Sequence, residues 1–179
     1  MNSSPAPLLR ESAVLVPVFR DAAGELRVVL VRRGERGVHG GQLAFPGGKR
    51  DPDDETLLAT ALRETREEVG LGAASIRVLA ALPEIQTFTT GFRITPFLAR
   101  ISPPPRWQFQ AGEIAEVLEV SLRHLADPAT YGQEDWQLAG WTQPAPISFL
   151  RVGPHQLWGA SYRILRPLLP RLLAGEWEV

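Results

Sequence analysis

Apolar residues in the first hundred positions gather in short runs that are separated by turn-forming residues. Runs rich in Val, Ile, Leu and Phe, bounded by Gly, Asp and Pro, are typical of β-strands. Five of them predict strands, over residues 13–19, 27–32, 42–45, 76–82 and 92–100. Turn-forming residues at 21–24 join the first two runs and predict a hairpin. Pro96 places the last run near a bulge or at an edge of the sheet.

The second half of the chain is patterned less regularly. Residues 136–141 and 147–152 predict two more strands, whereas residues 113–120 mix acidic and apolar positions. A short helix is expected to begin within residues 122–125. Leucines recur at helical spacing over residues 157–173, where two prolines are expected to kink the helix or split it in two.

One stretch of helical character lies between the strands, over residues 52–69. Asp51 is predicted as its N-cap, Pro52 as its first residue and Gly70 as its C-terminal stop. Strands with one central and one terminal helix indicate a mixed α/β (or α+β) fold. We expect a single domain over residues 1–179, with a loose N-terminus at residues 1–10, which contain serines and prolines.

Composition narrows the class of function. Nineteen basic and twenty acidic residues give a net charge of −1, which argues against a nucleic-acid partner. The absence of cysteine excludes disulfides, thiolate zinc sites and thiol catalysis. No secretory signal pattern and no spanning apolar run is present, so no membrane partner is expected. A cytoplasmic protein is therefore the default expectation.

Three carboxylates share one face of the central helix. At about 100° per residue, Glu64, Glu67 and Glu68 fall within an arc of roughly 100°. A separate stripe should pack on the sheet, so the acids are expected to point away from the core. That stripe consists of Leu58, Leu62, Thr65 and Val69. Oxygen ligands alone favour a hard cation, Mg²⁺ or Mn²⁺. The alternative is a solvated acidic face, although Arg63 is spaced to pair with Glu67.

The spacing of these residues resembles the Nudix box, the signature of hydrolases that cleave a nucleoside diphosphate linked to another group. The matching positions are Glu55, Arg63, Glu64, Glu67, Glu68, Gly70 and Leu71. The sequence departs from the box in two places. Six residues, rather than the family's five, separate Gly48 from Glu55, and the apolar position after Arg63-Glu64 is Thr65. Thr65 keeps a methyl group in the packed stripe, and its hydroxyl can bond to the Ala61 carbonyl.

The longer spacing resembles the coenzyme A pyrophosphatase branch of that family. Phe45 to Gly48 followed by Asp51, Pro52 and Asp54 matches its FPGG-x-x-D-P-x-D pattern, and the upstream signature is matched in part by Arg32, Gly41 and Gln42. Two later stretches also resemble this branch, T-F-T-T-G-F-R-I-T-P at 87–96 and a Trp-Gly pattern at 158–165.

The resemblance implies a mixed β-sheet sandwiched between helices and a metal-dependent mechanism. It implies that the Gly48 carbonyl and Glu64, Glu67 and Glu68 bind Mg²⁺ or Mn²⁺, which neutralise the pyrophosphate and activate a water. Glu55 and Arg63 are expected to hold the loop and helix together, although direct contact requires a curled helix start. The general base is left open between the box acids, Glu64 and Glu67 among them, and a later residue.

Residues outside the box complete the predicted site. The best later candidate for the base is Glu116, followed by Glu113. Arg32, Arg33 and Arg36 are the predicted phosphate ligands, because coenzyme A carries an additional 3′-phosphate. The glycine-rich residues 34–41 predict either a flexible connector or a loop that approaches a ligand closely.

Several functional alternatives stay open. The substrate is expected to be a small nucleotide: coenzyme A, or else ADP-ribose, a dinucleotide or a (d)NTP. A module that senses a nucleotide without cleaving it is an alternative of another class. The leucine-rich tail could pack within the domain or form a homodimer surface.

Overall fold

The predicted N-terminal hairpin lies at the centre of the fold. In the computed structural model, which describes residues 9–35, 40–87, 91–138 and 141–179, β1 (Arg10–Arg20) pairs antiparallel with β2 (Leu26–Arg33). The Asp21 carboxylate closes the connecting turn by accepting the backbone N–H groups of Ala23 and Glu25. The hairpin prediction is confirmed, but the loose segment predicted at residues 1–10 overlaps β1, and residues 1–8 lie outside the described ranges.

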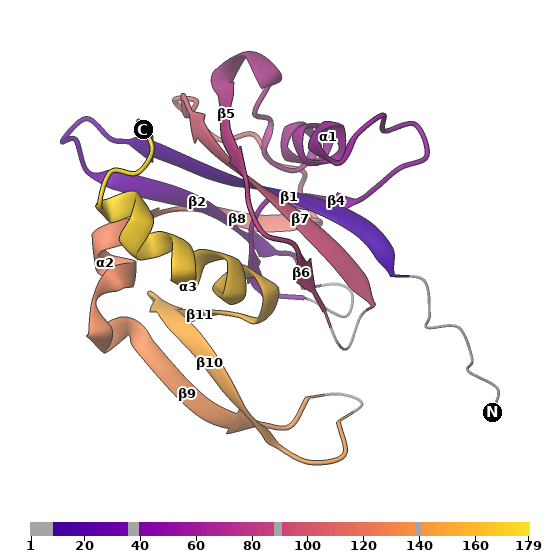
Figure 1. The fold of residues 1–179 in the computed structure, drawn as a ribbon, viewed down its shortest axis with the longest axis vertical. Helices are drawn as coiled ribbons and strands as arrows, with labels where there is room; N and C mark the ends of the chain where they lie inside the picture. Colours follow the sequence, from indigo (N-terminus) through magenta and orange to yellow (C-terminus); the bar gives the residue numbers. More distant parts are fainter. Residues whose placement is uncertain (1–8, 36–39, 88–90, 139–140) are drawn as a thin grey trace.

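The main sheet contains eight strands and has the order β3-β2-β1-β7-β5, with β4 paired to β1, β6 to β7 and β8 to β2 (Figure 1). The further strands are β3 (Leu43–Ala44), β4 (Gly47–Lys49), β5 (Ile76–Ala81), β6 (Ile85–Gln86), β7 (Phe92–Ile101) and β8 (Ile114–Ser121). Because β1 and β7 run parallel while the other pairs are antiparallel, the predicted mixed sheet is confirmed.

A second sheet follows the main one in sequence. It has the order β11-β10-β9, from β9 (Tyr131–Trp136), β10 (Ala145–Val152) and β11 (His155–Trp158). The prediction of a strand at 147–152 is confirmed. The one at 136–141 is wrong for residues 137, 138 and 141, and residues 139–140 lie outside the described ranges. The real strand ends at Trp136 and is mostly exposed and polar, so it carries little of the apolar signal that marks a strand.

The central helix is shorter than predicted. α1 spans Leu57–Val69, and its N-cap is Thr56, whose side chain accepts the Ala59 N–H at 3.1 Å. The prediction of an Asp51 cap and a helix from residue 52 is therefore wrong, because residues 51–56 form a loop. The predicted stop is confirmed: Gly70 caps α1 with φ 73°, and its N–H bonds to the Arg66 carbonyl. So is the predicted bond from the Thr65 hydroxyl to the Ala61 carbonyl, at 2.7 Å.

The remaining helices are α2 (Leu122–Ala126) and α3 (Gly159–Leu173), with short 3₁₀ turns at Ala73–Ser75 and Pro128–Thr130. α3 is one continuous helix, so of the two expected effects of its prolines, a kink or a split, the split does not occur. Pro167 and Pro170 both lie on its exposed side. The carbonyls that lose a hydrogen bond there, those of Arg163 and Arg166, belong to exposed residues and can bond to water.

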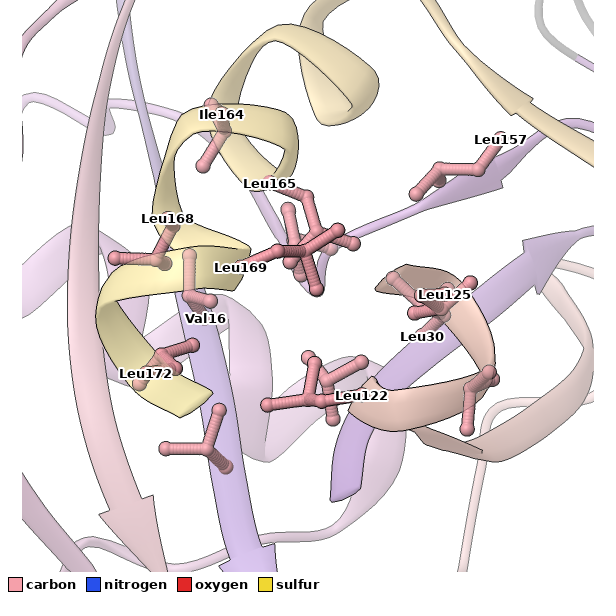
Figure 2. Close-up of a cluster of buried hydrophobic side chains, with 14 of the residues drawn as sticks. Val16, Leu30, Leu122, Leu125, Leu157, Ile164, Leu165, Leu168, Leu169 and Leu172 are labelled. Atoms are coloured by element: carbon pink, nitrogen blue, oxygen red, sulfur yellow. The ribbon is translucent and has the colours of Figure 1, made fainter. Parts of the chain in front are cut away.

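Helices cover both faces of the main sheet, with α1 on one side and α2 and α3 on the other (Figure 1). Val28 and Leu30 of β2 belong to a core cluster with α2 and α3, whereas Val29 and Val31 pack with Val69 of α1. Figure 2 shows the leucines of α3 directed toward Val16, Leu30 and α2. The apolar stripe of the tail therefore packs within the domain. In the described part of the chain, no helix is long and apolar enough to cross a membrane.

Candidate active site and metal centre

Glu68 is the most buried of the three carboxylates predicted to bind metal. It lies between α1 and β4, is 2% exposed, and accepts the Gly47 N–H at 2.9 Å. Burial raises its pKa to about 7, helped by the charges of Glu64 and Glu113 and opposed by the Gly47 N–H and Arg33. The expectation that all three acids point away from the core is therefore wrong for Glu68.

The face that α1 buries explains this difference. Its buried residues include Ala61, Thr65, Glu68 and Val69, while the predicted packing residues Leu58 and Leu62 are only half-buried. The helix is thus rotated so that a carboxylate enters the layer between helix and sheet. A buried carboxylate needs a compensating charge or donors, which argues against a merely solvated acidic face.

Glu64 lies directly against the glycine turn that precedes the helix. A Cβ atom placed on Gly48 would lie 2.5 Å from Glu64 Cδ, so only glycine allows this approach. Burial raises the pKa of Glu64 despite its bond to Arg63. The Gly48 carbonyl accepts the Ser12 hydroxyl at 2.7 Å.

Arg63 joins the carboxylates to the loop. Its Nη1 donates to Glu64 Oε1 at 2.9 Å and to Glu67 Oε2 at 3.1 Å, which confirms the predicted pairing with Glu67. Its Nη2 donates to the Lys49 carbonyl at 3.1 Å, and the remaining contacts are with Asp54, at 2.8 and 3.0 Å. Arg63 therefore ties α1 to β4 and to the preceding loop.

Asp54 is the partner of Arg63 that sequence reasoning did not identify. Its carboxylate is 7% exposed, and the bonds from Arg63, followed by those from Asp51 and Thr60, hold its pKa far below the usual range despite burial. Glu55, the predicted partner of Arg63, is exposed, and its backbone carbonyl accepts Arg50 at 3.3 Å. The signal that could have found Asp54 was the departure in loop length.

The predicted arginines separate onto the two faces of the sheet. Neighbouring side chains on a strand point to opposite faces, so Arg32 follows Leu30 toward the α2–α3 side and Arg33 follows Val31 toward α1. Arg32 bonds to Glu35 at 3.0 Å and to Glu116 at 3.5 Å. Arg33 instead acts on the α1 side, where its charge lowers the pKa of Glu68 against the larger effect of burial. Arg36 lies outside the described residues.

The same separation applies to the candidate bases. The β2–β8 register shifts between Arg32 and Arg33. Glu116, which pairs with Arg32 in this register, bonds to the Arg32 side chain and lies 3.7 Å from His155. Glu113 contributes, after burial, to the raised pKa values of Glu64 and Glu68. The structure therefore brings Glu113, and not Glu116, to the box carboxylates.

A groove of about 540 Å³ lies on the side of Glu116, away from the box carboxylates. It runs between β8, α2 and the β10–β11 turn, and its lining includes Glu116, Leu118, Val152 and the imidazoles of His124 and His155. None of the three metal-ligand candidates on α1 lines it. The chemistry of the box is thus located on α1 and β4 rather than in this groove.

The donor set on α1 suits a hard divalent cation. Within residues 9–35, 40–87, 91–138 and 141–179, no three His, Asp or Glu groups are already gathered as a metal site, and Arg63 bonds to both Glu64 and Glu67. Two of the three carboxylates, however, have pKa values raised by burial. A nearby positive ion stabilises the ionised form of such groups, and oxygen ligands favour Mg²⁺ or Mn²⁺. The residues present therefore fit the expected metal.

Comparison with known proteins places these residues in a family context. Residues 9–141 match the NUDIX domain family model. The chain is 35% identical over 160 residues to an uncharacterized Nudix hydrolase NudL of Citrobacter koseri, covering 89% of this chain and 81% of the relative. It is 33% identical over 163 residues to the NudL protein of Salmonella paratyphi B, with the same coverage.

Solved structures show the same fold. RenU, a Nudix hydrolase from M. smegmatis, superposes with a TM-score of 0.64 at 20% identity, over 95% of this chain and 89% of that one. The NUDIX domain of Shewanella oneidensis NrtR, crystallised with ADP ribose, gives 0.51 at 21% identity, over 68% and 80%. A C. elegans Ap4A hydrolase in a binary complex gives 0.54 at 21% identity, over 64% and 82%.

Proposed function

The chain belongs to the Nudix hydrolase family, and on that premise we propose that it cleaves the pyrophosphate of coenzyme A. The products would be 4′-phosphopantetheine and adenosine 3′,5′-bisphosphate, and the reaction would require Mg²⁺ or Mn²⁺. The observation that carries this proposal is the loop between Gly48 and Glu55. It is one residue longer than is usual in the family, and its Asp51, Pro52 and Asp54 match the coenzyme A branch. In the structure, Asp54 is the acid that binds Arg63.

The carboxylates of α1 would hold the metal. The buried Glu68, the half-buried Glu64 and the exposed Glu67 would bind the ion, and a backbone carbonyl of the glycine turn, such as that of Gly48, would complete the set. When bound, the divalent ion supplies positive charge to the pyrophosphate and lowers the pKa of a bound water. Arg63 orients Glu64 and Glu67 through its Nη1.

The remaining roles fall to residues on the α1 side of the sheet. Arg33 would bind a phosphate oxygen of the substrate, because its charge acts at the box carboxylates. A carboxylate of the site would accept the proton of the attacking water. Glu113 is the best-placed later residue for this role, with Glu64 and Glu67 as the candidates within the box. Arg32 and Glu116, which bond to each other, would not touch the pyrophosphate.

A second candidate is a broader nucleoside diphosphate hydrolase. The NUDIX domain of NrtR was crystallised with ADP ribose, and a C. elegans structure of the same fold is an Ap4A hydrolase. ADP-ribose and dinucleotides share the adenosine diphosphate part of coenzyme A but lack its 3′-phosphate and pantetheine arm. A specificity test therefore distinguishes the two candidates.

The test is a substrate panel. Coenzyme A, ADP-ribose, a diadenosine polyphosphate and a deoxynucleoside triphosphate would each be incubated with Mg²⁺ or Mn²⁺, and products separated by chromatography. We expect coenzyme A to have the highest kcat/KM. Cleavage of ADP-ribose with coenzyme A untouched would refute the finer proposal, and binding without turnover of any substrate would indicate a sensing module. Glu68→Gln should abolish metal-dependent turnover, whereas the exposed Glu55→Gln serves as the matched control.

A further inference from the structure

Two neighbouring residues, Asp54 and Glu55, could each be the first acid of the Nudix box, depending on how its spacing is counted. Counted back from Arg63 with seven intervening residues, the first acid of the box is Glu55. Counted forward from Gly48 with the family's five intervening residues, it is Asp54. We propose that Asp54 is the positioning residue that fixes Arg63 and, through Arg63, sets the metal-binding geometry of Glu64 and Glu67, while Glu55 has no such role. This inference rests on the proposed metal-dependent function.

The Asp54 carboxylate is surrounded by donors. Arg63 Nε bonds to Oδ1 at 3.0 Å, and Arg63 Nη2 bonds to Oδ2 at 2.8 Å, so the pairing is bidentate. Oδ2 also accepts the Thr60 hydroxyl and the Asp51 N–H, each at 2.9 Å. A planar guanidinium held by two parallel bonds keeps one orientation, which a single bond does not enforce. Asp54 therefore determines the plane of the Arg63 side chain.

The other edge of the same guanidinium faces the metal-ligand candidates. Nη1 donates to both Glu64 and Glu67, and Nη2 also donates to the carbonyl of Lys49, next to Gly48 in β4. One side chain thus links the glycine turn and two carboxylates. If Arg63 lost its bidentate partner, these bonds could still form, but in several orientations, and the two carboxylates would no longer be preorganised for a metal.

The loop itself is held in place from the opposite side. Arg50 donates through Nη2 to the backbone carbonyls of Asp54 at 3.1 Å and Glu55 at 3.3 Å, and through Nη1 to Glu11 of β1 at 2.8 Å. These bonds fix the backbone of both acids, yet only Asp54 directs its side chain into the layer beneath the helix. The Glu55 side chain lies at the surface. The extra loop residue thus moves the anchoring acid one position earlier in the chain.

The test compares Asp54→Asn with Glu55→Gln. Each variant removes one charge and keeps the size of the side chain. Mn²⁺ affinity would be measured by calorimetry without substrate, and kcat and KM would be measured against Mg²⁺ concentration on protein whose fold is checked by circular dichroism. We expect Asp54→Asn to weaken Mn²⁺ binding and to raise the half-activating Mg²⁺ concentration by about tenfold or more, as for other residues that orient metal ligands. In Asp54→Asn, the KM for the nucleotide should change by less than about threefold. Glu55→Gln should stay within about twofold of the wild type in Mn²⁺ affinity, in half-activating Mg²⁺ concentration and in KM.

Thr60→Val provides a second variant of nearly the same shape, which removes one donor to Asp54 Oδ2 and leaves every charge in place. It should weaken Mn²⁺ binding in the same direction but less, and it carries the test if Asp54→Asn does not fold. The proposal fails if Mn²⁺ affinity survives both changes, or if Glu55→Gln has the larger effect. Because Mn²⁺ binding is measured without substrate, this failure is distinct from a failure to cleave coenzyme A.

Discussion

Replacing Glu68 with glutamine should stabilise the metal-free protein at high pH while removing its response to metal. Burial raises the pKa of Glu68 to about 7 from an ordinary value of 4.5. Between these values the folded chain holds a proton that the unfolded chain has released, so stability falls as pH rises through this window. At 1.36 kcal/mol per pH unit, the full effect above pH 7 is about 3 kcal/mol. A neutral amide avoids this cost.

The assay is urea denaturation in the presence of a chelator at pH 5 and pH 8. At pH 5 the Glu68 side chain of the folded chain is largely protonated, and Glu68→Gln should match the wild type within about 1 kcal/mol. At pH 8 the variant should be more stable by as much as about 3 kcal/mol. Glu67→Gln is the matched control, because the Glu67 side chain is 46% exposed and its removal should give no such pH-dependent gain.

Addition of Mg²⁺ or Mn²⁺ should reverse the order at pH 8. An ion that binds only the folded protein stabilises it by RT ln(1 + [L]/Kd), about 4.1 kcal/mol at a thousandfold excess over Kd, which exceeds the variant's advantage of about 3 kcal/mol. The wild type should gain this stability and Glu68→Gln should gain little. Equal destabilisation of the variant at both pH values without metal would refute the reasoning, because Glu68 would then contribute by packing and hydrogen bonding rather than as a strained carboxylate.

Three further predictions concern the same site. Gly48→Ala should weaken Mn²⁺ binding by about tenfold or more in calorimetry, because its Cβ would displace Glu64; Gly72→Ala meets no atom within 4 Å and should have no effect. Arg33→Gln should lower kcat/KM about tenfold or more, whereas Arg32→Gln should change it by less than about threefold; equal losses would contradict the assignment of the two arginines to opposite faces. The lowered pKa of Asp54 contributes stability that is present above about pH 4 and lost on further acidification. Asp54→Asn should therefore lower the free energy of unfolding at pH 7, measured in urea, by on the order of 2 kcal/mol. The stability of this variant should also depend less on pH in the acid range.

Regular apolar patterns allowed much of the fold to be predicted. The hairpin of β1 and β2, the strands β5 and β7 and the stop of α1 at Gly70 all follow from short-range sequence features. β8 and β9 escaped the pattern because both carry acidic residues on exposed positions, and pairing with β2 and β10 stabilises them instead. Such tertiary pairing leaves no local trace in the sequence.

The start of α1 was missed for a related reason. Asp51 followed by Pro52 has the residue types of a helix start, and local propensity favours it. In the folded chain, however, the Asp51 N–H bonds to the Asp54 carboxylate, and Asp54 also binds Thr60 and Arg63. These bonds hold the segment as a loop and transfer the cap to Thr56. The contacts between Asp54 and Arg63, nine positions later, thus outweighed the local preference for a helix start.

The division of roles between Arg32 and Arg33 depends on the same kind of information. Their adjacency in sequence suggested a shared phosphate site, but alternation along β2 directs them to opposite faces. Glu113 precedes β8 and acts on the box carboxylates, whereas Glu116 lies within β8 and bonds to Arg32. Arg33 therefore acts electrostatically on Glu68 of α1, whereas Arg32 bonds to Glu116. Two adjacent residues of the same type can thus have different roles, because the alternation of a single strand places their side chains on opposite faces of the sheet.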